Sequence, residues 1–290
     1  MMSIEFQSVS KRFGSTQALN QVSLTLEEGH IYGLLGNNGA GKTTLLSILT
    51  DRLRPDSGHV LVDGESVRNN DEALGKLFLV GEQNFFPDDM KVKRAFQVAE
   101  SFYPDFDLNR AMELAKEFGL PLKKKITSLS TGYASIFRLV LGLSVNTPYI
   151  LFDEPVLGLD AQNRDLFYRL LIEKYSQDPC TILISTHLIA EVEHIIDHTI
   201  ILREGKVLRD APTEELMEDT YALSGPAGMV DQYAEGKNIL SCHTLGGLKT
   251  VSIQGQPEEE PPLGLEINRM SLQDYFISLQ EAEERKEEGQ

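Results

Sequence analysis

Residues 36–43 read Gly-Asn-Asn-Gly-Ala-Gly-Lys-Thr, and the spacing of the first and last glycines, Lys42 and Thr43 is that of a phosphate-binding loop. An apolar run at 31–35 predicts a buried strand before it, and residues 44–49 predict the opening of a helix after it. Glycines let the backbone curl around an anion, and the first N–H groups of a helix point toward that anion. The lysine would reach the β- and γ-phosphates, and the threonine hydroxyl would bind Mg²⁺. The sequence therefore predicts a site for a nucleoside triphosphate.

Composition limits the class of protein. The 290 residues are 41% hydrophobic and 24% charged, as expected of a globular chain large enough for a nucleotide-binding domain and a smaller appendage. The net charge of -17 makes a nucleic-acid partner unexpected. Cys180 and Cys242 have no metal-ligand spacing, and we see neither a signal peptide nor a run of the roughly 18 apolar residues that spans a bilayer. We therefore expect a cytoplasmic protein with free thiols.

The hydrophobic pattern predicts an α/β fold. Alternation at 22–26 predicts a half-buried antiparallel strand, whereas 149–153 and 181–185 are apolar throughout, as in central strands. A helical pattern follows each of the last two runs, which predicts a largely parallel sheet. A short hairpin is expected at 200–208.

Between the phosphate loop and residue 149 we expect a helix-rich insertion, at about 85–145. It includes a helix at 108–118 with Leu108, Met112 and Ala115 on one face.

The composition shifts after the hairpin, and we predict two domains, a nucleotide-binding domain at 1–215 and an accessory domain at 216–290. The second is expected to be a small α+β appendage with a Glu/Pro linker at 258–262, a last amphipathic helix at 272–284 and a solvated acidic tail.

Two adjacent carboxylates, Asp153 and Glu154, end the predicted strand at 149–153. Phosphoryl transfer needs Mg²⁺ opposite the phosphate loop and a base or water-orienting group beside it. Asp153 fits the first role and Glu154 the second, although ordinary acidity of a loop after a strand would give the same pair.

A second anion site is indicated at residues 129–133, which read Leu-Ser-Thr-Gly-Tyr and precede a helical run. The Ser130 hydroxyl and the Gly132 N–H would lie at the helix N-terminus, where an anion is stabilised. A simple helix cap is the alternative for this segment alone.

Together these segments resemble the ATP-binding cassette (ABC) family, with its signature segment at 129–133, its Walker B strand at 149–154 and its D-loop at 155–160, in the expected order. The resemblance extends over about residues 4–210. It implies a P-loop ABC-type ATPase core with an antiparallel β subdomain and a helical subdomain. The run at 102–107 and the helical tail at 271–280 look most like bacterial exporter cassettes.

The resemblance also implies a role for single residues. Phe13 matches the aromatic residue that stacks on adenine, Gln83 the glutamine that ligates Mg²⁺ and senses a membrane partner, and His187 the histidine that contacts the γ-phosphate. The implied nucleotide contacts are Phe13, Asn38, Gly39, Ala40, Gly41, Lys42, Thr43, Thr44, Gln83, Ser130 and Gly132. The implied Mg²⁺ ligands are Thr43, Gln83 and Asp153, and the implied catalytic residues are Lys42, Glu154 and His187.

The signature segment departs from the family pattern at two positions. Thr131 stands where the family has Gly, and Tyr133 stands where it has Gln. Ser130 and Gly132, which make the main phosphate contacts in the family, are kept, so we expect an active ATPase with a weaker or slower contact across the dimer.

In the family, two cassettes face each other head to tail with ATP between them, and the mate here would be a second copy or a related cassette. The resemblance implies an ATP-hydrolysing subunit that is peripheral on the inner face of the cell membrane and powers transport, in the direction of export, through separate permease subunits. The segment at 83–87, with the apolar pair Phe85 and Phe86, would help to form a groove for a permease helix.

Two other classes of protein remain as alternatives. One is a soluble ABC ATPase that acts on the ribosome or DNA, against which the chain has one phosphate loop and no room between Lys42 and Leu129 for a coiled-coil arm. The other is a nucleotide-gated interaction protein without turnover, which Glu154 and His187 together disfavour.

Overall fold

The computed structural model describes residues 2–83, 86–87, 89–257 and 260–288. By contacts within the chain it divides into two compact units, one formed by Met1–His187 with Ile200–Asp210 and the other by Leu188–Thr199 with Ala211–Gln290. The first unit thus ends at residue 210, and residues 188–199 belong to the C-terminal unit. The predicted boundary between functional domains at residue 215 stays a prediction.

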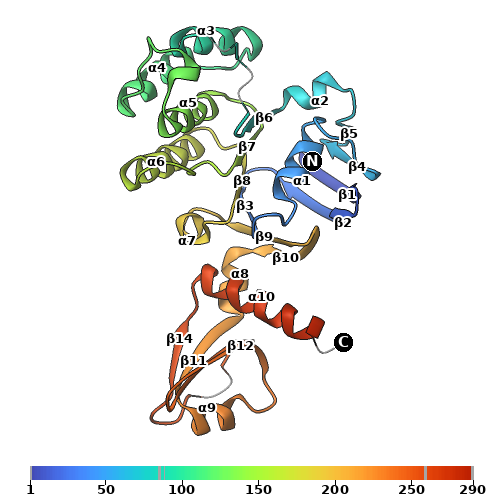
Figure 1. Ribbon diagram of the computed structural model, residues 1–290, viewed down its shortest axis with the longest axis vertical. Helices are drawn as coiled ribbons and strands as arrows, with labels where there is room; N and C mark the ends of the chain where they lie inside the picture. The colour runs from blue at the N-terminus through green and yellow to red at the C-terminus, as the bar shows by residue number, and fades with distance from the viewer. Residues whose placement is uncertain (1, 84–85, 88, 258–259, 289–290) are drawn as a thin grey trace. The chain divides into compact units, whose positions relative to one another are not determined.

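The centre of the first unit is a six-stranded sheet in the order β10-β9-β3-β8-β7-β6 (Figure 1). Its strands are β3 (Ile31–Leu35), β6 (Leu77–Val80), β7 (Tyr149–Asp153), β8 (Thr181–Thr186), β9 (His198–Arg203) and β10 (Lys206–Pro212). The four strands β3, β8, β7 and β6 run parallel. Because parallel strands end at the same edge, the segments that follow β3, β7 and β8 lie side by side there. The predicted central strands and hairpin are confirmed.

An antiparallel sheet in the order β2-β1-β4-β5 completes the nucleotide-binding core. Its strands are β1 (Ser3–Phe13), β2 (Thr16–Glu27), β4 (Ser57–Val62) and β5 (Glu65–Ser66). Val22, Leu24 and Leu26 on β2 are buried while the residues between them are exposed, as the alternation predicts. Helix α1 (Lys42–Leu49) packs its leucines into the same hydrophobic cluster as both sheets. The phosphate loop is therefore anchored at both ends in one core.

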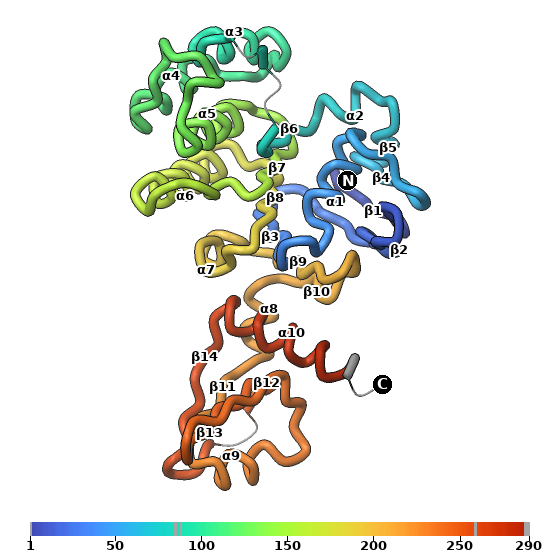
Figure 2. The backbone as a smooth tube through the Cα atoms, in the orientation of Figure 1, coloured from blue at the N-terminus to red at the C-terminus, as the bar shows by residue number. Residues whose placement is uncertain are grey.

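Helices make up most of the segment between β6 and β7. They are α3 (Val92–Phe102), α4 (Leu108–Glu117) and α5 (Thr131–Ser144), with a short 3-10 turn at Ile126–Ser128. Helix α2 (Asp71–Gly75) precedes β6, and α6 (Ala161–Gln177) follows β7. The backbone trace shows α3, α4 and α5 grouped together, away from the antiparallel sheet (Figure 2).

The predicted helix at 108–118 is confirmed as α4. The buried stripe of α4 consists of Ala111, Leu114 and Ala115, whereas Leu108 and Met112 are only half-buried. The buried face of α4 is thus rotated from the face that carries Leu108 and Met112, because α4 packs against both α3 and α5.

The second unit contains a four-stranded antiparallel sheet in the order β12-β13-β11-β14. Its strands are β11 (Thr220–Pro226), β12 (Asn238–Leu245), β13 (Leu248–Gln254) and β14 (Glu266–Arg269), and its helices are α7 (Ile189–Val192), α8 (Thr213–Glu218), α9 (Ala227–Ala234) and α10 (Leu272–Glu288). The predicted last helix is confirmed and extends to Glu288. Buried hydroxyls of Ser241, Ser252 and Ser278 bond to one another and fix α10 to β12 and β13. Of the predicted linker at 258–262, residues 258 and 259 lie outside the described residues.

Candidate nucleotide site

The phosphate loop has a backbone that only glycine can follow at two points. Gly41, the residue before α1, has φ 110°, and a Cβ added there would lie 2.5 Å from the Ala18 carbonyl oxygen. A Cβ on Gly36 would lie 2.4 Å from the Leu202 carbonyl oxygen. The loop therefore passes close to neighbouring backbone and directs the first N–H groups of α1 outward. This arrangement fits a phosphate group.

Lys42 is buried beneath the loop, and its ammonium group contacts three oxygens. Its Nζ donates to the carbonyl oxygens of Gly36, at 2.6 Å, and Asn37, at 3.3 Å. It also lies 3.5 Å from Oε1 of Glu154, the carboxylate that follows β7. The register of β3, β8 and β7 thus brings the loop and the Glu154 carboxylate to one place.

Asp153 is held by hydroxyls at the end of β7. Ser185 Oγ donates to Asp153 Oδ1 at 2.9 Å, and the Thr43 hydroxyl lies beside this carboxylate. Burial raises the pKa of the Asp153 carboxyl, because an ionised carboxylate loses hydration there. A hydroxyl and a carboxylate side by side are hard oxygen ligands of the kind that Mg²⁺ prefers, so this pair fits the ion.

Glu154 is tied to the residues that end β8. Its N–H donates to the Ser185 carbonyl oxygen at 2.8 Å, and Thr186 Oγ1 donates to its Oε2 at 3.1 Å. His187 Nδ1 lies 2.9 Å from its Oε1, within hydrogen-bonding distance. The structure therefore brings together Lys42, Thr43, Asp153, Glu154 and His187.

The other predicted site residues lie apart from this group. Phe13, near the β1–β2 turn, has 49% of its surface exposed and is no core residue. Ser130 caps α5, and Gly132 lies in the first turn of that helix. Among the described residues, no hydrogen bond or ion pair joins Ser130 or Gly132 to the phosphate loop.

The start of α5 instead contacts the loop that follows Glu154. A Cβ on Gly132 would lie 3.3 Å from the Gly158 carbonyl oxygen, and Ser135 Oγ donates to the Leu157 carbonyl oxygen at 3.1 Å. Asp160 then caps α6 by accepting from the Asn163 N–H at 2.9 Å. The signature segment and the loop at 155–160 are therefore one packed feature.

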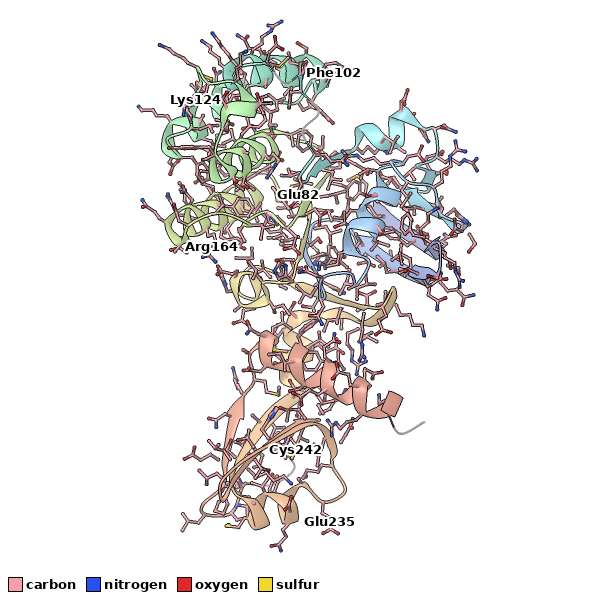
Figure 3. The ribbon with its side chains drawn as sticks, in the orientation of Figure 1. Glu82, Phe102, Lys124, Arg164, Glu235 and Cys242 are labelled. Atoms are coloured by element: carbon pink, nitrogen blue, oxygen red, sulfur yellow. The ribbon has the colours of Figure 1, made fainter. Side chains whose placement is uncertain are left out.

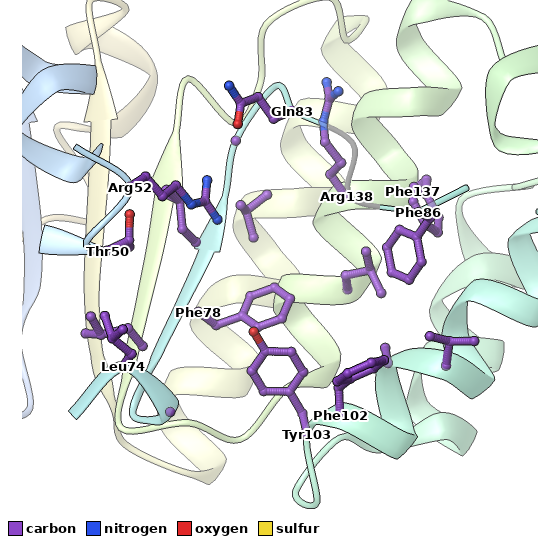
Figure 4. Close-up of a pocket in the computed structure, with 18 of the residues that line it drawn as sticks. Thr50, Arg52, Leu74, Phe78, Gln83, Phe86, Phe102, Tyr103, Phe137 and Arg138 are labelled. Atoms are coloured by element: carbon purple, nitrogen blue, oxygen red, sulfur yellow. The ribbon is translucent and has the colours of Figure 1, made fainter. Parts of the chain in front are cut away.

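Gln83 is exposed and borders an apolar groove of about 900 Å³ (Figure 4). Aliphatic and aromatic side chains form its wall: Phe78 packs edge-on against Tyr103 with ring centres 4.9 Å apart, and Phe86 packs against Phe137 at 5.6 Å. Phe102, at the end of α3, is 77% exposed (Figure 3). Asn84 and Phe85, which are part of the predicted docking segment, lie outside the described residues.

Two arginines also border the groove. Burial lowers the pKa of the Arg52 and Arg138 guanidinium groups, because each is partly removed from water. The groove is thus apolar along most of its lining and cationic at two places.

This combination of fold and site has known relatives. The sequence model of the ABC transporter family matches residues 19–157. ABC transporter ATP-binding protein YtrB from Bacillus subtilis (strain 168) is 30% identical over 279 residues, which cover 96% of this chain and 96% of that protein. The chain belongs to the ABC transporter family. Nod factor export ATP-binding protein I from Burkholderia lata is 33% identical over 236 residues, which cover 77% of each protein.

A solved structure of a dimeric bacterial ABC transporter cassette is 25% identical, with a TM-score of 0.64 over 72% of this chain and 98% of that one. The predicted cassette fold is thereby confirmed. As a member of the family, the chain is an ATP-binding and ATP-hydrolysing subunit of an ABC transporter, and cassettes of this kind form dimers.

Three side chains that support the site were not predicted from the sequence. Ser185 and Thr186 donate to Asp153 and Glu154, and a signal for them was present, since two hydroxyl residues end a strand that neighbours the carboxylate strand. Arg138, which bonds to the Glu82 carbonyl oxygen, gave no signal, because only the fold brings α5 next to the Gln83 loop.

Proposed function

We propose that this cassette is the cytoplasmic motor of an exporter and acts through separate membrane permease subunits. The observation that carries the proposal is the groove beside Gln83, because it offers an apolar surface next to a residue that the family uses to sense its membrane partner. An amphipathic helix is the ligand that fits such a groove, and a carboxylate on that helix would complement Arg52 and Arg138. The export direction is supported by the relative that is named for Nod factor export.

The described part of the chain has no helix with the length and apolar character needed to cross a bilayer. In our proposal the cassette is peripheral, on the inner face of the membrane, and the groove faces the permease.

Within one cassette, we assign the binding of the triphosphate to the phosphate loop and Lys42. The loop N–H groups, from Asn38 to Thr44, and the Lys42 ammonium would hold the β- and γ-phosphates, and Phe13 would stack on adenine. Phe13 is 49% exposed, so its side chain is accessible to a nucleotide, although the Lys11 ammonium lies over the ring at 5.6 Å from its centre.

Thr43 and Asp153 would hold Mg²⁺ together with Gln83, and the ion would supply positive charge to the phosphate oxygens. Among the described residues there is no group of three His, Cys, Asp or Glu side chains that could hold a metal. The proposed ligand set accords with this finding, since Mg²⁺ accepts hydroxyl and amide oxygens and keeps several waters.

Glu154 would take the proton of the attacking water, and His187 would donate a hydrogen bond to the γ-phosphate. The contact between the two side chains orients both, and Thr186 fixes the second oxygen of the carboxylate. Ser130 and Gly132 would complete the site of the partner cassette, where they would contact the γ-phosphate of the facing ATP. ATP would thus hold two cassettes together, and hydrolysis would release them.

Fractionation of cells that express the protein with its neighbouring genes tests this proposal. We expect the cassette in the membrane fraction and a multi-span membrane protein in its purified complex. Cassette found wholly in the soluble fraction, with ribosomes or with no membrane protein, would instead support a soluble ABC ATPase.

A further inference from the structure

Three residues, Val80, Gly81 and Arg138, border both the apolar groove and a small pocket that contains Asp153 and Glu154. Of these three, only Arg138 carries a polar side chain. Figure 4 shows it on its helix at the groove, on the same side as Gln83. The side chain therefore stands between the surface proposed for the membrane partner and the carboxylates proposed for hydrolysis.

The guanidinium of Arg138 bonds in two directions. Its Nη1 donates to the Glu82 carbonyl oxygen at 3.1 Å, directly before Gln83. Its Nη2 donates to Ser135 Oγ, also at 3.1 Å. The Ser135 hydroxyl in turn donates to the Leu157 carbonyl oxygen at 3.1 Å.

The second branch reaches the catalytic segment through the backbone. The Leu157 N–H donates to the Glu154 carbonyl oxygen at 3.2 Å, which closes the turn that begins with Glu154. Ser135 is buried, and its two hydrogen bonds are partly buried with it. One guanidinium thus holds the Gln83 loop and the Glu154 turn at the same time.

An arginine suits this task because its planar fork fixes two acceptors in a set geometry, and a charged donor makes a stronger hydrogen bond than a neutral one. We propose that Arg138 is a positioning residue that couples occupancy of the groove to the geometry of Gln83 and Glu154. The proposal rests on the proposed function, since it requires a partner in the groove. A partner group that contacts the guanidinium shifts the balance between two arrangements of both loops, and the rate of hydrolysis changes with it.

The basal reaction gives the first test, with purified Arg138→Met, Arg138→Lys and Ser135→Ala variants. We expect kcat to fall about 3- to 30-fold in Arg138→Met and Ser135→Ala, while KM for ATP stays unchanged. Arg138→Lys should recover part of the rate, because an ammonium group can make one of the two bonds. The double variant with Arg138→Met and Ser135→Ala should be no slower than Arg138→Met alone, since both changes break one chain of contacts.

Arg94→Met is the matched control, because Arg94 is exposed on α3 and bonds to Gln97 of the same helix at 3.3 Å. Its kcat should equal that of the wild type. A wild-type kcat in Arg138→Met, or additive losses in the double variant, would overturn the positioning role. A raised KM together with a lower melting temperature in both single variants would also overturn it, because that result indicates a contact that only stabilises the fold.

The complex with the membrane protein that co-purifies gives the second test. We expect the membrane protein to stimulate ATP hydrolysis by the wild type and by Arg94→Met, but not by Arg138→Met. Equal stimulation of all three would overturn the coupling. If no membrane protein co-purifies with the wild type, the proposed function fails, while the basal measurements still decide whether Arg138 positions the two loops.

Discussion

Glu154 has φ 49°, in the left-handed region that a residue with a side chain seldom adopts, at a cost of about 1–3 kcal/mol. Its N–H bond to Ser185 and the contacts of its carboxylate with Thr186 and His187 hold it there. A strained residue that is held by this many contacts is typical of a site where the direction of one side chain matters.

Glu154→Gln should therefore keep ATP binding and lose turnover. The amide retains the size of the side chain but cannot accept a proton, and removal of a positioned base costs about 10² to 10⁴ in rate. Steady-state hydrolysis measures the loss, and size-exclusion chromatography with ATP should show an accumulated dimer. Turnover at the wild-type rate would remove Glu154 from the catalytic role.

Lys42→Ala and Phe13→Ala should weaken nucleotide binding in different ways. Loss of the Lys42 ammonium removes the charge proposed to face the β- and γ-phosphates, so ATP should lose more affinity than ADP. Phe13 would touch only the base, so its loss should weaken ATP and ADP equally and more modestly. Calorimetric titration with both nucleotides separates the two effects, and a Phe13→Ala variant that discriminates between them would contradict the stacking role.

The group around Glu154 shows what sequence could and could not predict at this scale. Lys42 was predicted from the spacing of the phosphate loop, Asp153 from the apolar strand that it ends, and His187 from the resemblance to the family. A groove at Gln83 was expected from the resemblance, but the places of Arg52 and Arg138 beside it depend on how the chain folds, which no local pattern encodes.

At the level of elements, α5 packs against the sheet through a glycine. A Cβ on Gly142 would lie 2.5 Å from Cγ2 of Val80 and 3.0 Å from Cε1 of Phe152. Both neighbours are buried on strands β6 and β7, and valine has little freedom to turn away. The absence of a side chain therefore sets how closely the signature helix approaches the strands that carry the Gln83 loop and Asp153.

Gly142→Ala should destabilise the protein by about 1–3 kcal/mol, because overpacking outweighs the gain of about 1 kcal/mol that alanine brings to a helix. Unfolding in urea measures the change. Gly75→Ala, at the end of α2 with open space around the added carbon, should be neutral or slightly stabilising. If Gly142→Ala were as stable as that control, the close packing of α5 would be refuted.

The presence of helix α4 could be predicted from the spacing of its apolar residues and the length of the run. Which face of α4 is buried could not. Its sequence offers apolar residues on adjoining faces, and contacts with α3 and α5 decide that Ala111 and Leu114 turn inward. Tertiary packing thus selects the face of a helix that is apolar on more than one side.

At the level of the whole molecule, the core of the second unit is separate. Tyr221, Leu223, Val230, Val251 and Ile253 belong to a cluster that contains no residue of the first unit. The shift in composition near residue 216 indicated an added unit, but residues 188–199, which group with it, precede the hairpin. The order of the sequence cannot show that residues 188–199 belong to the second unit, because this grouping depends on contacts between α7 and α10.

The docking proposal depends on the exposed wall of the groove, and Phe102 tests it best. The ring is 77% exposed, so an aspartate there should leave the fold intact, while it places a charge where an apolar helix would bind. Loss of an aromatic anchor typically weakens an interface by about 2 kcal/mol or more, roughly 30-fold. Phe102→Asp should therefore move the cassette out of the membrane fraction while its basal ATP hydrolysis persists.

Ile172→Asp is the control that should stay with the membrane, because Ile172 lies on α6, is 37% exposed and is not part of the groove lining. Fractionation of cells that express each variant with the neighbouring genes, followed by assay of the recovered protein, measures both properties. Retention of Phe102→Asp at the wild-type level would show that the groove is not the docking surface. Release of both variants would show that a new negative charge on either surface is enough to detach the cassette. The groove would then not be a specific docking surface.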